Sequence, residues 1–94
     1  MPAYLIGHVT VKDPELWKSY VAGVRKTLIP FRAEVLFRAK RSTVLAGEHH
    51  HQNTVVVKFP DQRTLQSWYA SQAYQELIPI RDQAADVVLI SYDD

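Results

Sequence analysis

The sequence predicts an α+β domain of the ferredoxin-like type, with four strands and two helical regions in the order βαββαβ. Four stretches rich in β-branched and aromatic residues alternate with two stretches whose apolar side chains follow helical spacing. The chain has 94 residues, enough to build one core but too few for two domains. We therefore treat residues 1–94 as a single domain.

The first strand is predicted over residues 3–11, because this stretch is rich in Val, Ile, Leu, Tyr and Thr and shows an alternating pattern. One face carries Leu5, Gly7, Val9 and Val11. The other face carries Tyr4, Ile6, His8 and Thr10. Neither set is fully polar, so both faces are expected to be covered.

The first helix is predicted to begin at Asp13-Pro14-Glu15. Asp13 can accept hydrogen bonds from the free amides of the first turn, and proline suits the first helical position. Apolar side chains then recur at helical spacing as far as Leu28, and Pro30 ends the helix.

A second helical region follows Pro60. Asp61 is predicted to cap its first helix, Ser71 to cap a continuation, and Pro79 to break or kink that continuation. The remaining strands are predicted over residues 34–40, 54–59 and 86–92. Residues 43–46 are expected to extend the second strand after a bend, and residues 47–53 to form a polar loop.

This order lays both helical regions on one face of an antiparallel sheet, because the two crossovers are right-handed. The other face is left uncovered. It is expected to contain Tyr4, Ile6, Leu36, Val56 and one apolar set of the last strand. Exposed apolar sheet marks an association surface, so we predict a homodimer in which two copies pack sheet against sheet.

Composition argues against several classes of function. The 11 basic and 10 acidic residues leave a net charge of +1, without the basic excess that nucleic-acid binding needs. The absence of cysteine excludes thiol chemistry, and three isolated glycines form no phosphate loop, so no cofactor is expected. No signal peptide and no apolar run of about 20 residues is visible, so we expect a cytoplasmic protein without membrane contact.

Several motifs together resemble one family. They are Thr-Val-x-Asp-Pro-Glu at residues 10–15, Val-Val-Val-Lys-Phe-Pro at 55–60, Trp-Tyr-x-Ser-x-x-Tyr-Gln at 68–75 and Pro-x-Arg-x-x-Ala at 79–84. The chain resembles the DUF1330 family, within the dimeric α+β barrel superfamily, over almost its whole length. The resemblance implies a ferredoxin-like subunit and a barrel-like dimer with facing sheets.

The resemblance implies no reaction, because DUF1330 is a family of uncharacterised function. Relatives in the wider superfamily include cofactor-free monooxygenases, haem-degrading proteins and lactone isomerases, which is an analogy of fold alone. Members often carry glycines on both sides of the second strand, where this chain has Arg32-Ala33 and Ala39-Lys40. They also often carry an acid where this chain has Lys58.

His8 and Arg38 are the candidate catalytic residues. His8 shares a strand face with Tyr4, the face assigned to the barrel interior, and could transfer a proton near neutral pH. The alternative is an inert interface histidine. Alternation places Arg38 with Leu36, and the next strand could bring Lys58 to the same face. Arg38 would then clamp a carboxylate or enolate, or pair with a glutamate across the dimer.

Five further residues are predicted to bind substrate: Tyr4, Lys58, Trp68, Tyr74 and Arg81. Trp68 is mostly core by its spacing. Tyr74 and Arg81 are seven residues apart and could flank a pocket mouth, with the Tyr74 hydroxyl as a donor. Alternatively they form a surface pair that fixes the bend at Pro79.

The run His49-His50-His51 suggests a metal site, since His49 and His51 could share a side of an extended loop. Two imidazoles alone make a weak site, because zinc sites usually have three or four protein ligands. We therefore predict a solvated loop and no metal.

The sequence leaves two functional hypotheses open, and it does not decide whether the protein is an enzyme. The first is a small-molecule-binding protein or cofactor-independent enzyme acting on a small carbonyl, carboxylate or aromatic compound. The second is a non-catalytic dimeric structural or interaction module. A closed pocket would favour the first hypothesis, and an interior filled by side chains would favour the second.

Overall fold

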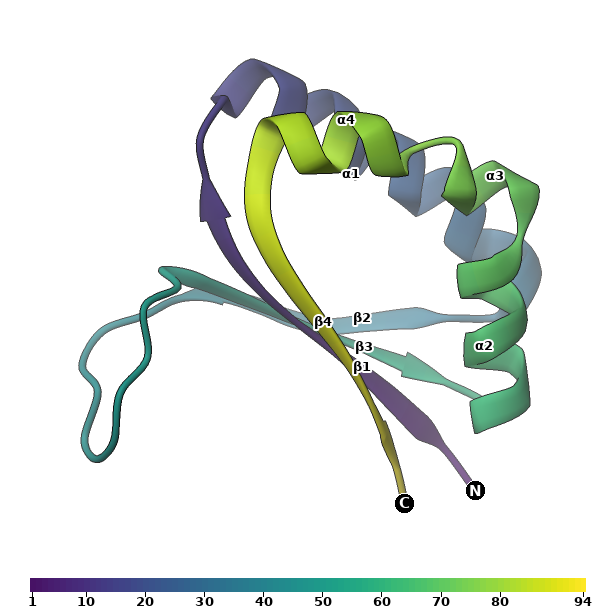
Figure 1. The fold of residues 1–94 in the computed structure, drawn as a ribbon. Helices are drawn as coiled ribbons and strands as arrows, with labels where there is room; N and C mark the ends of the chain where they lie inside the picture. Colours follow the sequence, from purple (N-terminus) through teal and green to yellow (C-terminus); the bar gives the residue numbers. More distant parts are fainter.

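A computed structural model describes residues 1–94, and the predicted βαββαβ order is confirmed (Figure 1). The strands are β1 (Ala3–Val11), β2 (Glu34–Lys40), β3 (Asn53–Phe59) and β4 (Ala85–Asp93). The helices are α1 (Pro14–Leu28), a short 3-10 helix η1 (Ile29–Phe31), α2 (Gln62–Ala70), α3 (Gln72–Gln75) and α4 (Ile78–Ala84).

Side-chain caps begin the helices where the sequence predicts them. Asp13 accepts hydrogen bonds from the amides of Glu15 and Leu16 at 3.1 and 3.2 Å. Asp61 accepts one from the Thr64 amide at 2.7 Å, and the Ser71 hydroxyl accepts one from the amide of Tyr74. Pro79 lies in the first turn of α4, so the proline starts a new helix instead of bending an existing one.

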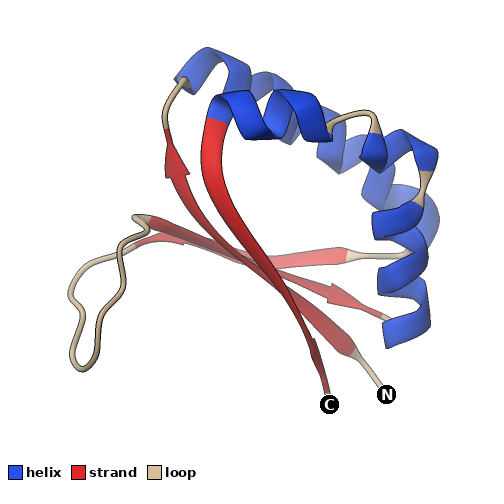
Figure 2. Cartoon of the chain, viewed as in Figure 1, coloured by secondary structure: helices blue, strands red, loops and turns tan.

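The four strands form one antiparallel sheet in the order β2-β3-β1-β4. All the helices lie on one side of this sheet, and the other side has no helical cover (Figure 2). The sheet is strongly curved, and both termini lie at the same edge of the molecule (Figure 1). The long helix α1 packs beside α4 over the sheet.

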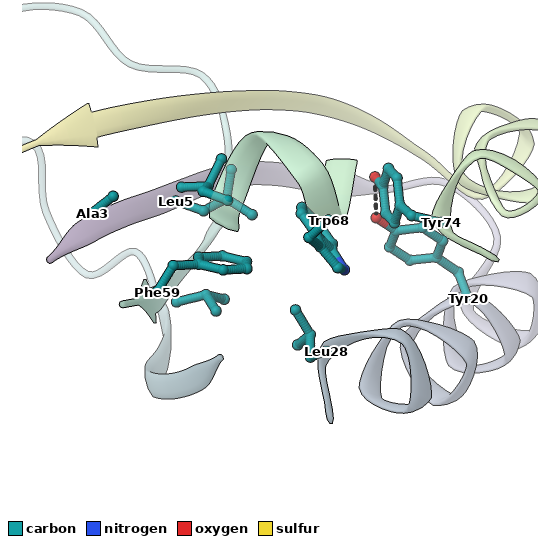
Figure 3. Packing of buried hydrophobic residues seen from close by; sticks show 9 residues of the cluster. Ala3, Leu5, Tyr20, Leu28, Phe59, Trp68 and Tyr74 are labelled. Carbon is teal, nitrogen blue, oxygen red and sulfur yellow. Dashed lines mark hydrogen bonds between the residues drawn. The ribbon is translucent and has the colours of Figure 1, made fainter. Parts of the chain in front are cut away.

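The covered face of the sheet contributes four of the nine side chains of the buried core cluster, and the helices contribute the other five. Ala3, Leu5 and Val9 of β1 are buried, as the alternation predicts. Ala3 and Leu5 pack with side chains from α1, α2 and α3, and Figure 3 shows this cluster. Phe59 and Trp68 are almost completely buried, with ring centroids 5.4 Å apart.

The uncovered face carries apolar side chains on all four strands, as predicted. On β4 these are Val88, Ile90 and Tyr92, which are between 37 and 46 % exposed. The register places Ile90 beside Ile6, and Ile6 beside Val56 of β3. A continuous apolar strip therefore crosses the sheet on the side that the helices do not reach. We call this surface, together with Phe37 of β2, the open face.

One irregularity changes the predicted facing of β2. The strand has an extra residue, Leu36, between Val35 and Phe37, which is a β-bulge. Val35 lies opposite Val57 and Phe37 lies opposite the neighbouring Val56, so the two lie on different faces. In a regular strand Val35 and Phe37 would share a face; here they do not, because a bulge interrupts the two-residue period.

The long connection after β2 is a loop over residues 41–52. The predicted strand extension over residues 43–46 is wrong, since no strand forms there. The loop projects from the sheet on the side away from the helices (Figure 1). The Arg41 amide donates to the carbonyl of Gln52, which closes the base of the loop. No helix of the chain is long and apolar enough to span a bilayer.

The backbone of Arg32 is strained, which leads to a prediction about stability. Its backbone has φ 54° and ψ 33°, the left-handed conformation that costs a residue with a Cβ about 1 kcal/mol or more. Arg32→Gly is expected to raise the free energy of unfolding by up to about 1 kcal/mol, measured by urea denaturation. The neighbouring Ala33→Gly has no such strain to relieve and is expected to destabilise. Equal destabilisation by both variants would contradict the prediction.

Candidate functional site

A cavity of about 320 Å³ lies between α1 and the covered face of the sheet. Every strand and the helices α1 and α2 contribute to its walls. Fourteen of its eighteen wall residues are hydrophobic, and both tryptophans of the chain, Trp17 and Trp68, are among them. Its volume is at the lower end of the roughly 300–1,000 Å³ of small-ligand pockets. The interior is therefore not completely filled by side chains.

The few polar wall residues come from the adjoining ends of β2 and β3. They are Arg38, Lys40, Asn53 and Thr54. Arg38 and Lys40 are exposed, so they lie where the cavity opens to solvent. The cavity thus combines an apolar interior with a cationic rim.

Arg38 has no acidic partner. The three ion pairs of the chain, Lys12–Asp86, Lys18–Glu15 and Arg81–Asp82, do not include it. Partial burial, together with repulsion from the nearby Arg25 guanidinium, lowers the pKa of Arg38 below its ordinary value. Its positive charge is therefore uncompensated at the edge of an apolar cavity, a position suited to an anionic ligand group.

The predicted pairing of Arg38 with Leu36 and Lys58 on one face is wrong. After the bulge, Arg38 lies opposite Val55, which lies opposite Gly7 on the covered side of the sheet. Lys58 lies opposite Tyr4, on the open face. Tyr4 and Lys58 are therefore separated from the cavity by the sheet itself.

His8 also lies on the open face, opposite Thr54 of β3 and Val88 of β4. Its Nδ1 is 3.2 Å from the Thr54 hydroxyl oxygen, and its ring stands edge-on to His49, with centroids 4.8 Å apart. Burial, then the charges of His49 and His51, lowers the pKa of His8 below 6.5. His8 and Arg38 do not meet, because they point to opposite sides of one sheet.

The loop histidines are less solvated than the sequence predicts. His49 and His51 are half-buried, and their ring centroids are 5.9 Å apart. The Nδ1 of His51 lies 3.0 Å from the Thr10 hydroxyl on the open face. We call His8, His49 and His51 the histidine cluster. Neither this cluster nor any other set of three histidine and carboxylate side chains is arranged to hold a metal ion.

Trp68 is the predicted substrate-binding residue that the structure brings to the cavity. Its indole Nε1 donates to the Thr27 hydroxyl at 2.9 Å, and that hydroxyl donates to the Val24 carbonyl at 2.7 Å. Both polar groups are therefore satisfied within the protein. The ring of Trp68 is free to act as an apolar wall, and it has no spare donor for a ligand.

Tyr74 and Arg81 meet, but not at a pocket mouth as predicted. Tyr74 is fully buried, and Arg81 Nη1 donates to its hydroxyl at 3.0 Å. The Tyr74 hydroxyl also lies 2.8 Å from that of Tyr20 (Figure 3). Burial alone would lower the pKa of Arg81, but hydrogen bonds to Tyr69 and Tyr74 hold it above its ordinary value.

Tyr20 is the wall residue that sequence reasoning did not single out. It lines the cavity and stacks on Trp17, with ring centroids 5.0 Å apart. Its spacing on α1 indicated only a core residue. The polar partner that makes it different, Tyr74, lies 54 residues away and gives no local signal.

The family model for the domain of unknown function DUF1330 matches residues 2–93. The chain belongs to the DUF1330 family. No functionally curated protein matches it in sequence.

Solved structures share the fold of this DUF1330 member at low sequence identity. A protein of unknown function from Rhodopseudomonas palustris matches with a TM-score of 0.81 and 17% identity, over 99% of this chain and 82% of that one. SnoaB, a cofactor-independent oxygenase from Streptomyces nogalater, matches with a TM-score of 0.68 and 10% identity, over 99% and 92% of the two chains. A dimeric ferredoxin-like protein of unknown function from Jannaschia sp. CCS1 matches with a TM-score of 0.70 and 7% identity, over all of both chains.

The histidine cluster predicts a pH-dependent stability. The folded-state pKa of His8 is lower than its unfolded value of 6.5, so the folded chain favours the neutral ring. Stability from this preference is complete above pH 6.5 and is lost as pH falls through the lowered folded pKa. Urea denaturation between pH 5 and 8, at fixed protein concentration, is expected to show a shallower acid loss for His8→Gln than for the wild type.

His50→Gln is the matched control for this measurement. His50 is in the same loop but is exposed. Its substitution is expected to leave the acid slope as it is in the wild type. An unchanged slope in His8→Gln would show that the cluster does not disfavour protonation.

Proposed function

We propose that this protein binds a small apolar or aromatic molecule bearing an anionic group, in the cavity between α1 and the sheet. The observation that carries this proposal is an apolar cavity of about 320 Å³ with the unpaired guanidinium of Arg38 at its rim. The apolar walls suit a hydrocarbon or aromatic body. The planar fork of arginine suits a carboxylate, which it can hold through two hydrogen bonds.

The lack of a protein partner for Arg38 supports a ligand in that role. Arg38 has no acidic partner in the chain, and the positive charge of the nearby Arg25 repels its guanidinium. An anion at the rim would supply the missing partner and offset the repulsion. The same anion would come within range of Lys40, which shares the rim.

The cavity favours ligand binding over the alternative of a structural module, whose interior would be filled. A cofactor-independent oxygenase, SnoaB, has this fold, but at 10% identity the likeness supports only the architecture. Within one subunit the sheet separates His8 from the cavity, so we assign His8 to the open face and not to proton transfer on this ligand.

We further propose that two copies of the chain pair through their open faces. Val88, Ile90 and Tyr92 expose apolar surface there, and contiguous exposed apolar surface is uncommon on monomers. Two structures with the same fold, one of them from Jannaschia, are described as dimeric ferredoxin-like proteins. Tyr4, His8 and Lys58 would then be interface residues.

Binding of 2-naphthoate tests the proposed function, with its neutral amide, 2-naphthamide, as the matched ligand. Quenching of Trp17 and Trp68 fluorescence reports on the cavity, since both rings line it. The carboxylate is expected to bind on the order of tenfold more tightly than the amide, because a hydrogen bond to a charged group contributes about 1.5–3 kcal/mol. Arg38→Gln is expected to remove this preference.

Two variants make the result specific. Val21→Phe reduces the volume of the cavity and is expected to weaken both ligands alike. Arg63→Gln removes an exposed arginine of α2 that does not line the cavity, and it is expected to change neither affinity. A preference for the carboxylate that survives in Arg38→Gln would overturn the assignment of Arg38.

Sedimentation equilibrium tests the pairing of open faces. The wild type is expected to be dimeric at micromolar concentration, and Ile90→Lys to be monomeric, because it buries a charge in an apolar interface. Ile29→Lys is the control: Ile29 is 76 % exposed but lies on η1, away from the open face. A monomeric wild type would contradict the proposed dimer. An Ile90→Lys protein that stays dimeric would contradict pairing through the open faces.

A further inference from the structure

Two buried phenols lie against the cavity and share a hydrogen bond. The hydroxyls of Tyr20 on α1 and Tyr74 on α3 are 2.8 Å apart, and Figure 3 shows them facing each other. Tyr20 is 6 % exposed and Tyr74 is fully buried. Only Tyr20 is a wall residue of the cavity.

Arg81 limits the arrangements of this hydrogen bond to two, and the position of the cavity distinguishes them. A guanidinium can only donate, so the Tyr74 oxygen accepts from Arg81 Nη1 at 3.0 Å. The two phenols have two protons, but only one lies between their oxygens. Either direction leaves one phenol proton without an acceptor in the protein. If Tyr20 were the donor, that proton would be on Tyr74, which is fully buried and does not line the cavity. If Tyr74 donates to Tyr20, the remaining proton is on Tyr20, where a ligand in the cavity can accept it, and this is the arrangement that a bound ligand would favour.

The proton of Tyr20 then has no acceptor in the protein. The Tyr20 hydroxyl makes a single hydrogen bond, the one with Tyr74. Tyr20 is also a wall residue of the cavity, so a ligand there can approach it. Burial, then the neighbouring Tyr74, raises the pKa of Tyr20 well above its ordinary value, so the phenol keeps its proton. The chain from Arg81 through Tyr74 also polarises this hydroxyl as a donor.

We propose that the Tyr20 hydroxyl donates a hydrogen bond to a carbonyl oxygen of the ligand and thereby selects oxo compounds among anionic apolar molecules. This inference rests on the proposed function and extends it. Arg38 would hold the anionic group at the rim, and Tyr20 would recognise a neutral acceptor on the body of the ligand. The ligand class is then an oxo acid with an apolar or aromatic body.

An isosteric pair of ligands tests this selection. 4-Acetylbenzoate and 4-isopropenylbenzoate share a carboxylate and a shape and differ only by a ketone oxygen in place of a methylene. Calorimetric titration of the wild type is expected to show on the order of tenfold tighter binding of the ketone, the effect of one hydrogen bond to an otherwise unpaired donor. Tyr20→Phe is expected to bind both ligands equally, at the affinity of the alkene.

Tyr69→Phe is the matched control. Tyr69 also accepts a hydrogen bond from Arg81 Nη1, at 3.4 Å, but does not line this cavity. This variant is expected to keep the preference for the ketone. A preference that persists in Tyr20→Phe would overturn the proposal, and so would equal binding of the two ligands by the wild type.

A spectroscopic readout keeps the test independent of how well the variant folds. The ketone stretching band of 4-acetylbenzoate is expected to shift to lower frequency in the wild-type complex, and an unshifted band would overturn the proposal. Failure of the proposed function looks different, because neither benzoate would then bind the wild type. If both bind equally and both depend on Arg38, the cavity site stands and only the role of Tyr20 is lost.

Discussion

The sheet of this chain has two apolar faces, and its helices can cover only one of them. This constraint determines the rest of the structure. β1 shows the constraint most directly, because Leu5 and Val9 face the helices while Ile6 faces away from them. The covered face has a core of its own. The other face has only the loop over residues 41–52 beside it, which leaves Val88 and Ile90 exposed. The sheet therefore has the cavity on one side and the exposed apolar open face on the other.

Alternation and β-branched composition predict the four strands to within one residue at each end, and the caps at Asp13, Asp61 and Ser71 predict where helices begin. These signals are local, since each depends on residues a few positions apart. The bulge at Leu36 has no such signal, because no glycine or proline marks it. Its effect reaches far: one additional residue moves Arg38 to the cavity side and leaves Lys58 on the other.

The candidate site was less accessible to sequence reasoning than the fold. Trp68 and Tyr74 were named, but their environments depend on Thr27 and Tyr20, which come from α1. An aromatic residue at helical spacing is normally a core residue. The sequence pattern does not show whether the proton of a tyrosine hydroxyl has an acceptor in the protein. That distinction emerges only when every donor and acceptor around Arg81 is counted.

Strand β3 contributes residues both to the cavity and to the open face. Val55 lines the cavity, and the adjacent Thr54, which borders the cavity at its polar end, has its hydroxyl 3.2 Å from His8 Nδ1 on the open face. A partner that packs against the open face would contact Thr54, and a ligand in the cavity would contact Val55. Because sheet side chains alternate, Val55 and Val57 face the cavity and Val56 faces the other way, and Thr54 is the residue of β3 that borders both surfaces. Assembly and ligand binding can therefore be altered separately by substitution, although one strand of seven residues supports them both.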